Sequence, residues 1–147
     1  MKNISTAVII FALAGLGKWQ PDFSTARKIA KEKHQLILLN FSGSDWCIPC
    51  IRMRKEVFEN SAFLQMADTT LVMYNADFPR KKKNEPDKKI KKQNEELADK
   101  YNPEGKFPFT LLINAEGKVI KTWDGYPDQT PEQFTHLVKQ LSDDNRH

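Results

Sequence analysis

Two cysteines stand three residues apart in the run Cys47-Ile48-Pro49-Cys50. Two thiols at this spacing can close a disulfide within one helical turn, so they can exchange electrons with other disulfides. Paired cysteines also form halves of zinc sites, but zinc needs four ligands. The chain has no second cysteine pair, and its histidines are His34, His136 and His147. The spacing therefore favours redox chemistry over a metal site or two inert core cysteines.

The dithiol lies between a predicted strand and a predicted helix. Residues 36–41 form a short apolar run, interrupted only by Asn40, which is typical of a strand buried on both faces. Helical spacing extends from Cys47 to about Met66. A thiol at a helix N-terminus faces free backbone N–H groups and the positive end of the helix dipole, which favour the thiolate. We therefore predict that Cys47 is the nucleophile and that Cys50 resolves a mixed disulfide. Pro49 suits a first helical turn, where its missing N–H costs nothing.

The rest of the chain alternates between helical and strand-like patterns. Further helices are predicted over residues 22–33, 88–101 and 131–141, and further strands over residues 71–76, 109–113 and 119–123. Strands joined by helices imply parallel pairing, whereas the last two strands, joined by a turn at residues 114–117, imply an antiparallel hairpin. The prediction is an α/β fold with a central mixed β-sheet and helices on both faces.

Composition limits the classes of protein to consider. The chain has 147 residues, 39% of them hydrophobic, and only two cysteines, which predicts one globular domain and excludes a disulfide-rich scaffold or a polytopic membrane protein. Residues 80–100 contain nine basic and five acidic residues, which accounts for the whole net charge of +4. This mixed run is typical of a solvated surface, with a patch that steers an acidic partner as the alternative. It has no aromatic platform for stacking bases, so no nucleic-acid partner is expected.

The N-terminus has the features of a secretory leader. Lys2 precedes an apolar stretch at residues 4–16, and Ala12 and Ala14 offer small side chains where a signal peptidase cleaves. We predict a signal peptide over residues 1–14, followed by a domain at residues 19–147, with a buried N-terminal strand or an uncleaved anchor as alternatives. The expected product is a periplasmic or secreted monomer without stable membrane insertion. Such a compartment is oxidising, so a dithiol there can take part in disulfide exchange.

The chain resembles the thioredoxin superfamily, in the secreted or periplasmic bacterial branch that handles disulfides. The likeness extends from about Trp19 to Leu141 and rests on the strand at residues 36–41 and on three motifs, Trp46-Cys47-Ile48-Pro49-Cys50, Asp77-Phe78-Pro79 and Phe107-Pro108-Phe109-Thr110, with Gly125 after the last strand. It implies a thioredoxin-like fold and an enzyme of the cell envelope, a protein thiol-disulfide oxidoreductase. Its partners would be protein disulfides or dithiols and an upstream redox partner, with no cofactor and no metal. The alternative is a non-catalytic peptide-binding module of the same fold.

The resemblance also assigns roles around the two cysteines. It implies that Trp46 shields the pair and that Pro108 is a cis-proline placed beside it. Phe107 would then line a groove for an extended substrate, and Gly125 and Tyr126 would form the other wall. For Phe107 and Tyr126, ordinary core packing at the end of the sheet is the alternative.

One departure from the family concerns proton transfer. Many thioredoxins bury an aspartate one residue before the Phe of this strand, and this chain has Asn40 there. A neutral amide cannot accept a proton at pH 7, so deprotonation of Cys50 must use water, Asp45 or another group. For Asp45 the alternative is an ordinary exposed loop residue.

Overall fold

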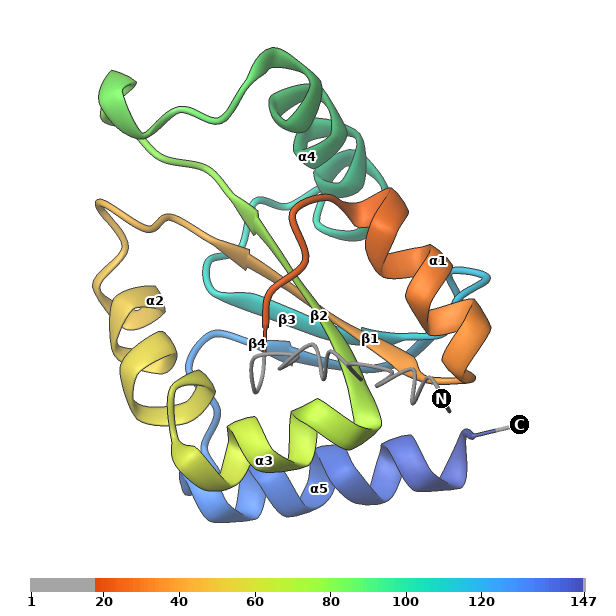
Figure 1. Cartoon of the computed structure of the whole chain (residues 1–147). Helices are drawn as coiled ribbons and strands as arrows, with labels where there is room; N and C mark the ends of the chain where they lie inside the picture. Colours follow the sequence, from red (N-terminus) through yellow and green to blue (C-terminus); the bar gives the residue numbers. More distant parts are fainter. Residues whose placement is uncertain (1–17, 147) are drawn as a thin grey trace, which may run out of the picture.

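A computed structural model describes residues 18–146 of the chain (Figure 1). The signal peptide predicted over residues 1–14 lies outside these residues and stays a prediction. Between residues 18 and 146, no helix combines the length and the apolar character that crossing a membrane requires.

Helices and strands form close to the positions that apolar periodicity predicts. Along the chain they are α1 (Phe23–Lys33), β1 (Leu36–Ser42), α2 (Ile48–Met53), the π-helical turn η1 (Arg54–Phe58), α3 (Ser61–Thr70), β2 (Leu71–Asp77), the 3-10 turn η2 (Lys82–Asn84), α4 (Lys88–Tyr101), β3 (Phe109–Ile113), β4 (Val119–Asp124) and α5 (Pro131–Asp144). The longer helices start after a polar residue whose side chain accepts a backbone N–H of the first turn. These caps are Asp22, Asn60, Asp87 and Thr130.

The strands form one mixed sheet in the order β2-β1-β3-β4. β1 pairs in parallel with β2, and β3 and β4 form the predicted antiparallel hairpin. The expectation of parallel pairing after a helix is wrong for β3, which follows α4 and runs antiparallel to β1. The reason is the segment 102–108, which returns the chain to the end of the sheet where β1 and β2 finish, so that Phe109 starts β3 beside Phe41. This return brings Pro108 to the end of the sheet from which the chain enters α2.

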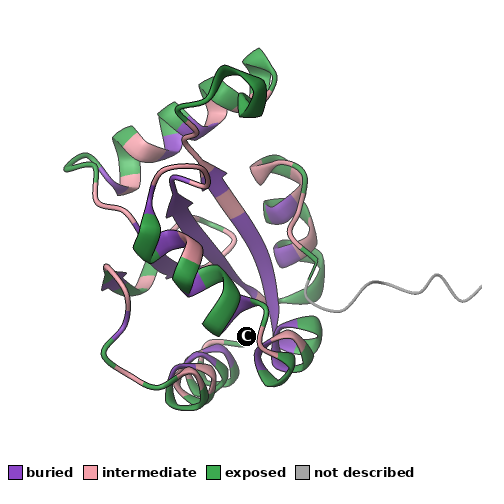
Figure 2. Ribbon diagram, turned by 90° about the vertical axis from the view of Figure 1, so that its left-hand side faces the viewer, coloured by how far each residue is buried: buried purple, intermediate pink, exposed green. Residues whose placement is uncertain are grey.

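Helices cover both faces of the sheet, as predicted. Figure 1 shows α1 and α4 on one face and α3 and α5 on the other. Two apolar clusters fill the layers between them: Phe58, Phe63 and Phe134 belong to the α3 and α5 side, and Ala26 and Tyr74 to the α1 and α4 side. All of β1 is buried (Figure 2), which confirms the expectation of a strand covered on both faces.

The single helix predicted from Cys47 to about Met66 is wrong, because the structure divides it. After α2 and η1 the chain leaves helical geometry at Glu59, and the Asn60 side chain accepts a backbone N–H at 3.0 Å to start α3. Apolar periodicity does not reveal the break, because Phe58 before it and Phe63 after it face the same cluster.

Candidate active site

Cys47 and Cys50 form a disulfide where the chain enters α2, and their Cα atoms lie 5.2 Å apart. Cys47 is the N-cap of this helix, and its Sγ accepts the backbone N–H of Cys50 at 3.3 Å. Pro49 occupies the first turn, as predicted. The two cysteines are 4% and 5% exposed, whereas Ile48 between them is 77% exposed. The disulfide therefore lies just below the surface, beside a solvated apolar side chain.

The loop between β1 and Cys47 is fixed by contacts with β2 and with itself. The N–H of Cys47 donates to the carbonyl of Gly43 at 2.8 Å. At the end of β2, the Asp77 carboxylate accepts the N–H of Ser44 at 2.9 Å and its hydroxyl at 2.5 Å. A Cβ atom on Gly43 would lie 2.2 Å from Cε2 of Trp46, so the loop has no room for a side chain there. The position of Cys47 thus depends on both parallel strands.

Trp46, the aromatic residue that precedes the pair, is held from three directions. Its indole N–H donates to the carbonyl of Phe78 at 2.7 Å. Its ring meets that of Phe107 edge to face, with centroids 5.4 Å apart, and the Arg80 guanidinium lies 4.0 Å from its centroid. Such aromatic and cation–π contacts fix the indole beside the dithiol.

The Phe107–Pro108 peptide bond is cis, as the resemblance implied. Pro108 is buried, and its carbonyl accepts the N–H of Gly125 at 2.8 Å. Gly125 has a φ of 78°, in the left-handed region that glycine adopts without strain. The ring of half-buried Phe107 packs against Trp46 and Phe78. The structure therefore joins the Pro108 and Gly125 backbones and places Phe107 against the residue that precedes the dithiol.

Tyr126 lies at the edge of this arrangement, tied to the outer surface of α2 and η1. Its hydroxyl donates to Glu56 at 2.5 Å, and the Arg52 guanidinium lies 4.3 Å from its ring centroid. Burial, followed by the bond to Glu56, raises the pKa of Tyr126, and the same bond lowers the pKa of Glu56. Tyr126 also packs against the apolar cluster on the α3 and α5 side of the sheet. The loop after β4 is therefore fastened to the helix that carries Cys50.

Asp45 anchors the segment that follows β2. Its carboxylate accepts the backbone N–H groups of Arg80 and Lys81 and the side-chain amide of Asn84, each at 2.9 Å. These bonds, the one from Arg80 first, lower the pKa of Asp45 to about 2. A carboxylate with so low a pKa is a weak proton acceptor at neutral pH. The geometry gives Asp45 a positioning task.

We expect this anchor to be released in acid. The bonds favour the ionised carboxylate, so their stabilising effect is complete above the ordinary pKa of 3.8 and is lost as the pH falls towards about 2. In an NMR titration, the amide resonances of Arg80 and Lys81 should shift with a midpoint near pH 2, and Asp45→Asn should remove this transition. The Phe78 amide, which donates to the Ser42 carbonyl, is the internal control and should not follow it. A midpoint at 3.8 or above would contradict the anchor.

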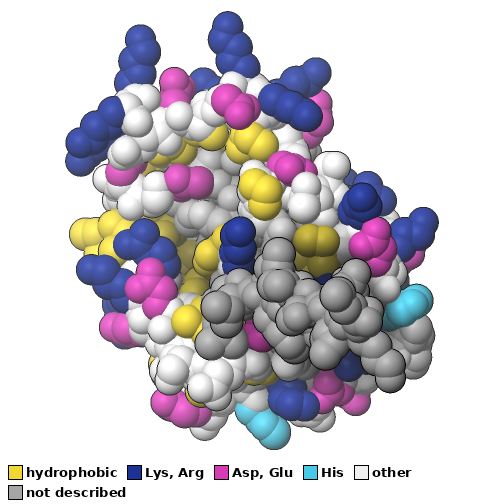
Figure 3. All heavy atoms as spheres, viewed as in Figure 1, with side chains coloured by type: hydrophobic (Ala, Val, Ile, Leu, Met, Phe, Trp, Pro, Cys, Tyr) yellow, Lys and Arg dark blue, Asp and Glu magenta, His cyan; other side chains and the backbone are white. Residues whose placement is uncertain are grey.

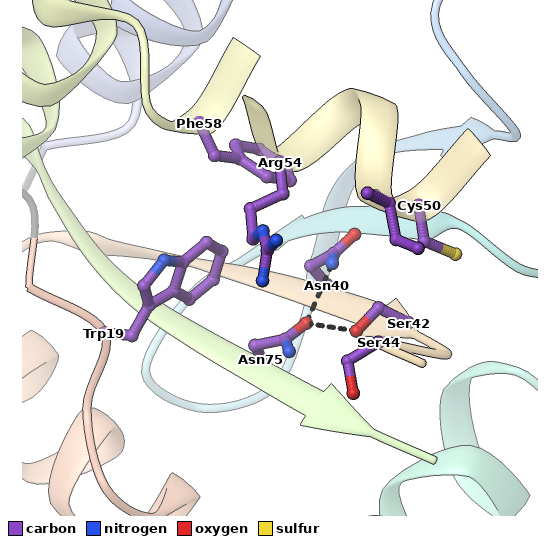
Figure 4. A pocket seen from close by; sticks show the side chains of 9 residues that line it. Trp19, Asn40, Ser42, Ser44, Cys50, Arg54, Phe58 and Asn75 are labelled. Atoms are coloured by element: carbon purple, nitrogen blue, oxygen red, sulfur yellow. Dashed lines mark hydrogen bonds between the residues drawn. The ribbon is translucent and has the colours of Figure 1, made fainter. Parts of the chain in front are cut away.

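A pocket of about 280 Å³, lined by both apolar and polar side chains, lies behind Cys50 (Figure 4). It is lined by Trp19, Asn40, Ser42, Ser44, Cys50, Ile51, Arg54, Phe58 and Asn75. Figure 4 shows the Arg54 side chain reaching from η1 towards Asn40 and Asn75. Asn40 is 5% exposed; its side chain donates to Asn75 at 2.8 Å and accepts from the Thr110 hydroxyl at 2.9 Å. The polar lining residues offer amides, hydroxyls and one guanidinium but no carboxylate, so none of these side chains is a good proton acceptor for Cys50 at neutral pH.

Several residues that shape the site were not predicted as site residues from the sequence. Arg54 and Asn75 line the pocket and Arg80 covers Trp46, but none of the three stands in a motif with chemistry of its own. Asp77 and Phe78, which hold the loop and the indole, do carry a signal, because they belong to a motif on which the resemblance rests.

The two histidines in the described part of the chain lie on elements other than those around the dithiol. His34 ends α1, and His136 is exposed on α5. Residues 18–146 contain no group of three or more His, Cys, Asp or Glu side chains arranged to hold a metal ion.

Comparisons with known proteins agree with this geometry. Residues 23–142 match the family described as a thioredoxin-like domain. Disulfide bond reductase DsbH of Chlamydia pneumoniae is 37% identical over 103 residues, which cover 70% of this chain and 60% of that protein. Thioredoxin-related protein DsbJ of the same organism is 29% identical over 129 residues, or 84% of this chain and 36% of that protein. The chain thus spans less than two thirds of either relative.

One solved structure matches over nearly the full length of both chains. It is described as a DsbH oxidoreductase and superposes with a TM-score of 0.78 at 31% identity. The match covers 97% of this chain and 94% of that one, so the likeness includes the whole sheet and the helices on both of its faces.

Proposed function

The chain belongs to the thioredoxin-like family, and from this premise we propose that it is a thiol-disulfide oxidoreductase that acts on disulfides of other proteins. The observation that carries the proposal is the Cys47–Cys50 disulfide, formed where β1 leads into α2, with the N–H of Cys50 directed at Sγ of Cys47. Two cysteines so placed alternate between a bridged and a dithiol state without a large change of the backbone. The activity then needs no further group, because the electrons reside on sulfur.

In the reducing direction, the reaction starts from the dithiol. The Cys47 thiolate attacks one sulfur of a substrate disulfide, a mixed disulfide forms, and the other substrate sulfur leaves as a thiolate that takes up a proton. The Cys50 thiolate then attacks Sγ of Cys47, which forms the internal disulfide and releases the second substrate thiolate. Two electrons pass to the substrate, and an upstream redox partner returns them to the protein.

The local structure favours Cys47 as the attacking group. The first backbone N–H groups of a helix have no acceptor within the helix, and one of them, from Cys50, already donates to Sγ of Cys47 at 3.3 Å. In the dithiol state the same N–H groups and the helix dipole would stabilise a thiolate on Cys47. Cys50 lies one turn further along, within reach of the mixed disulfide.

Cys50 must lose a proton before it can attack. Asn40 is an amide engaged with Asn75 and Thr110, and Asp45 is committed to the segment after β2. The pocket behind Cys50 has room for water and polar groups to bind it. We therefore assign this deprotonation to water in the pocket, one of the proton acceptors expected in place of the carboxylate that Asn40 replaces.

Substrate contact is assigned to the surface around the pair. Ile48 is a solvated apolar side chain next to both cysteines, and Phe107 packs against Trp46 on the other side. The backbone before the cis-proline Pro108 can pair with an extended peptide, as an added strand does. Gly125, bonded to Pro108, and Tyr126 beyond it would bound this groove.

The setting is part of the same proposal. A leader at residues 1–14 would deliver the domain at residues 19–147 to the periplasm or outside the cell. There it would act as a monomer on other proteins that contain disulfides. The name of the relative DsbH, a disulfide bond reductase, favours the reducing direction for this chain as well.

Cys50→Ser should turn the enzyme into a trap for its substrates. Cys47 can still attack, but the mixed disulfide then has no internal thiol to resolve it. When the reduced variant is mixed with insulin, non-reducing electrophoresis and intact mass should show a covalent adduct that dithiothreitol releases. The double variant Cys47→Ser/Cys50→Ser is the matched control and should form none; an adduct with that variant, or none with Cys50→Ser, would contradict the assignment.

The reduction potential separates the enzyme from a non-catalytic module. A potential well below about −300 mV, measured by equilibration with thiol buffers, would mark a disulfide too stable to turn over and would favour the module.

A further inference from the structure

Four consecutive basic residues, Arg80 to Lys83, follow β2 and are called here the basic segment. In Figure 1 the chain leaves β2 towards η2 at the same end of the sheet from which it enters α2 after β1. The N–H of Phe78 donates to the carbonyl of Ser42, the last residue of β1, at 2.8 Å. The basic segment therefore begins beside the loop that leads to Cys47.

The basic segment is attached to that loop by several bonds. Asp45 accepts the N–H groups of Arg80 and Lys81 and the side-chain amide of Asn84, and the Arg80 guanidinium lies over Trp46. Asp45 and Trp46 directly precede Cys47 in the chain. The basic segment is thus attached to the two residues that precede the dithiol in the chain.

The lysines of the segment are available for a partner. Lys81, Lys82 and Lys83 are exposed, and none of them takes part in an ion pair among residues 18–146. Glu85, the nearest acidic residue along the chain, is paired with Lys91 at 2.9 Å. In Figure 3, Lys and Arg side chains project from the upper part of the molecule, the part that holds η2 and α4 in Figure 1.

We propose that the basic segment is a docking surface for acidic stretches of the protein substrates that bring their disulfides to Cys47. This inference rests on the proposed function and adds a substrate preference to it. Positive charge fixed beside a reactive sulfur raises the local concentration of an acidic partner and speeds its encounter. An acidic stretch bound there would hold a neighbouring disulfide close to the dithiol.

A protein partner fits the segment better than a nucleic acid or a lipid surface. No aromatic residue stands between Pro79 and Lys100, so bases have no ring on which to stack. Between Arg80 and Lys89 there is also no large apolar side chain that would enter a membrane interface. The contacts to Asp45 and Trp46 connect the segment with the dithiol, whose substrates are disulfides.

The test compares peptide disulfides that differ only in a flanking stretch of either aspartates or serines. For the wild-type protein, kcat/KM at low salt should be at least about tenfold higher for the acidic peptide, and the preference should vanish as salt shortens the screening distance from about 30 Å to about 3 Å. The triple variant Lys81→Glu/Lys82→Glu/Lys83→Glu should lose the preference but keep its rate with the serine peptide.

A matched control distinguishes local from overall charge. Lys28→Glu/Lys31→Glu/Lys118→Glu changes the net charge equally at exposed positions on α1 and the final hairpin, and it should keep the preference. Two results would overturn the docking surface and leave the oxidoreductase assignment intact. One is an equal loss of the acidic-peptide preference in both triple variants; the other is a wild-type protein that reduces both peptides with no preference for the acidic one. Binding of the wild type to phosphatidylserine vesicles or to DNA without a peptide preference would overturn it in favour of those partners. Failure to reduce either peptide would instead count against the proposed function.

Discussion

Cys47→Ser should reduce insulin no faster than dithiothreitol does without protein. A serine hydroxyl stays protonated at neutral pH and cannot form a mixed disulfide, so the first step of exchange is lost. Cys50 lies inside α2, whereas Cys47 is the N-cap whose Sγ accepts a free N–H of the first turn, so Cys50 lacks the stabilisation that would let it attack in place of Cys47. The measurement is the turbidity of insulin chains released with dithiothreitol as the reductant.

Two controls make the result interpretable. The thermal unfolding of Cys47→Ser should match that of the reduced wild-type protein, which shows that the fold survives the change. The alkylation rate of Cys47 in the wild-type dithiol, followed against pH, should report a thiolate that forms well below the ordinary value of about 8.5. Insulin reduction by Cys47→Ser at the wild-type rate, or an ordinary thiol pKa at position 47, would remove the basis of the mechanism.

Phe134→Ala should destabilise the fold by about 3–5 kcal/mol. Phe134 is fully buried on α5, and its ring centroid lies 5.0 Å from that of Trp123, 6.1 Å from Phe63 and 6.4 Å from Phe58. Removing the ring leaves a cavity where α5, α3, η1 and β4 meet. The expected loss of unfolding free energy is a large part of the roughly 5–15 kcal/mol that is usual for a folded domain. Urea unfolding of the oxidised proteins measures the change.

The control lies two residues away on the same helix. His136 is exposed, so His136→Ala should change the free energy of unfolding by less than about 0.5 kcal/mol. A loss below about 1 kcal/mol for Phe134→Ala would mean that this cluster does not fasten α5 to the sheet as the structure shows.

The site depends on several segments that meet at one end of the sheet. The Cys47 loop follows β1, Asp77 ends β2, and the cis-proline Pro108 directly precedes β3. Because β1 and β2 are parallel and β3 is antiparallel to β1, the last residues of β1 and β2 and the first residue of β3 lie at the same end of the sheet. Gly125 after β4 reaches the same place through its bond to Pro108. Neighbouring strands thus position the dithiol, with Cys47 at the N-cap of α2 and Cys50 in its first turn.

Local patterns were sufficient for most of the secondary structure and for the dithiol. β1 is apolar except for Asn40 and Ser42, and this nearly continuous apolar run predicted a strand buried on both faces. Pro49 stands in the first turn of α2, the helical position where a missing N–H costs least. The helix break at Asn60 was not predicted, because the apolar residues on both sides of it contact one cluster. Periodicity reports which face is buried; it does not report whether the helix is continuous.

Within the candidate site, the sequence determined the reactive groups, and the tertiary structure decided their surroundings. The spacing of Cys47 and Cys50, and the amide at Asn40 in place of a carboxylate, can be read directly because each is a matter of residue type and local order. The sequence does not reveal that Asp45 binds Arg80 or that Arg80 covers Trp46, because each of these contacts joins residues more than thirty positions apart. Short-range preferences act along the chain, whereas contacts between distant segments exist only after the sheet has brought the strand ends together.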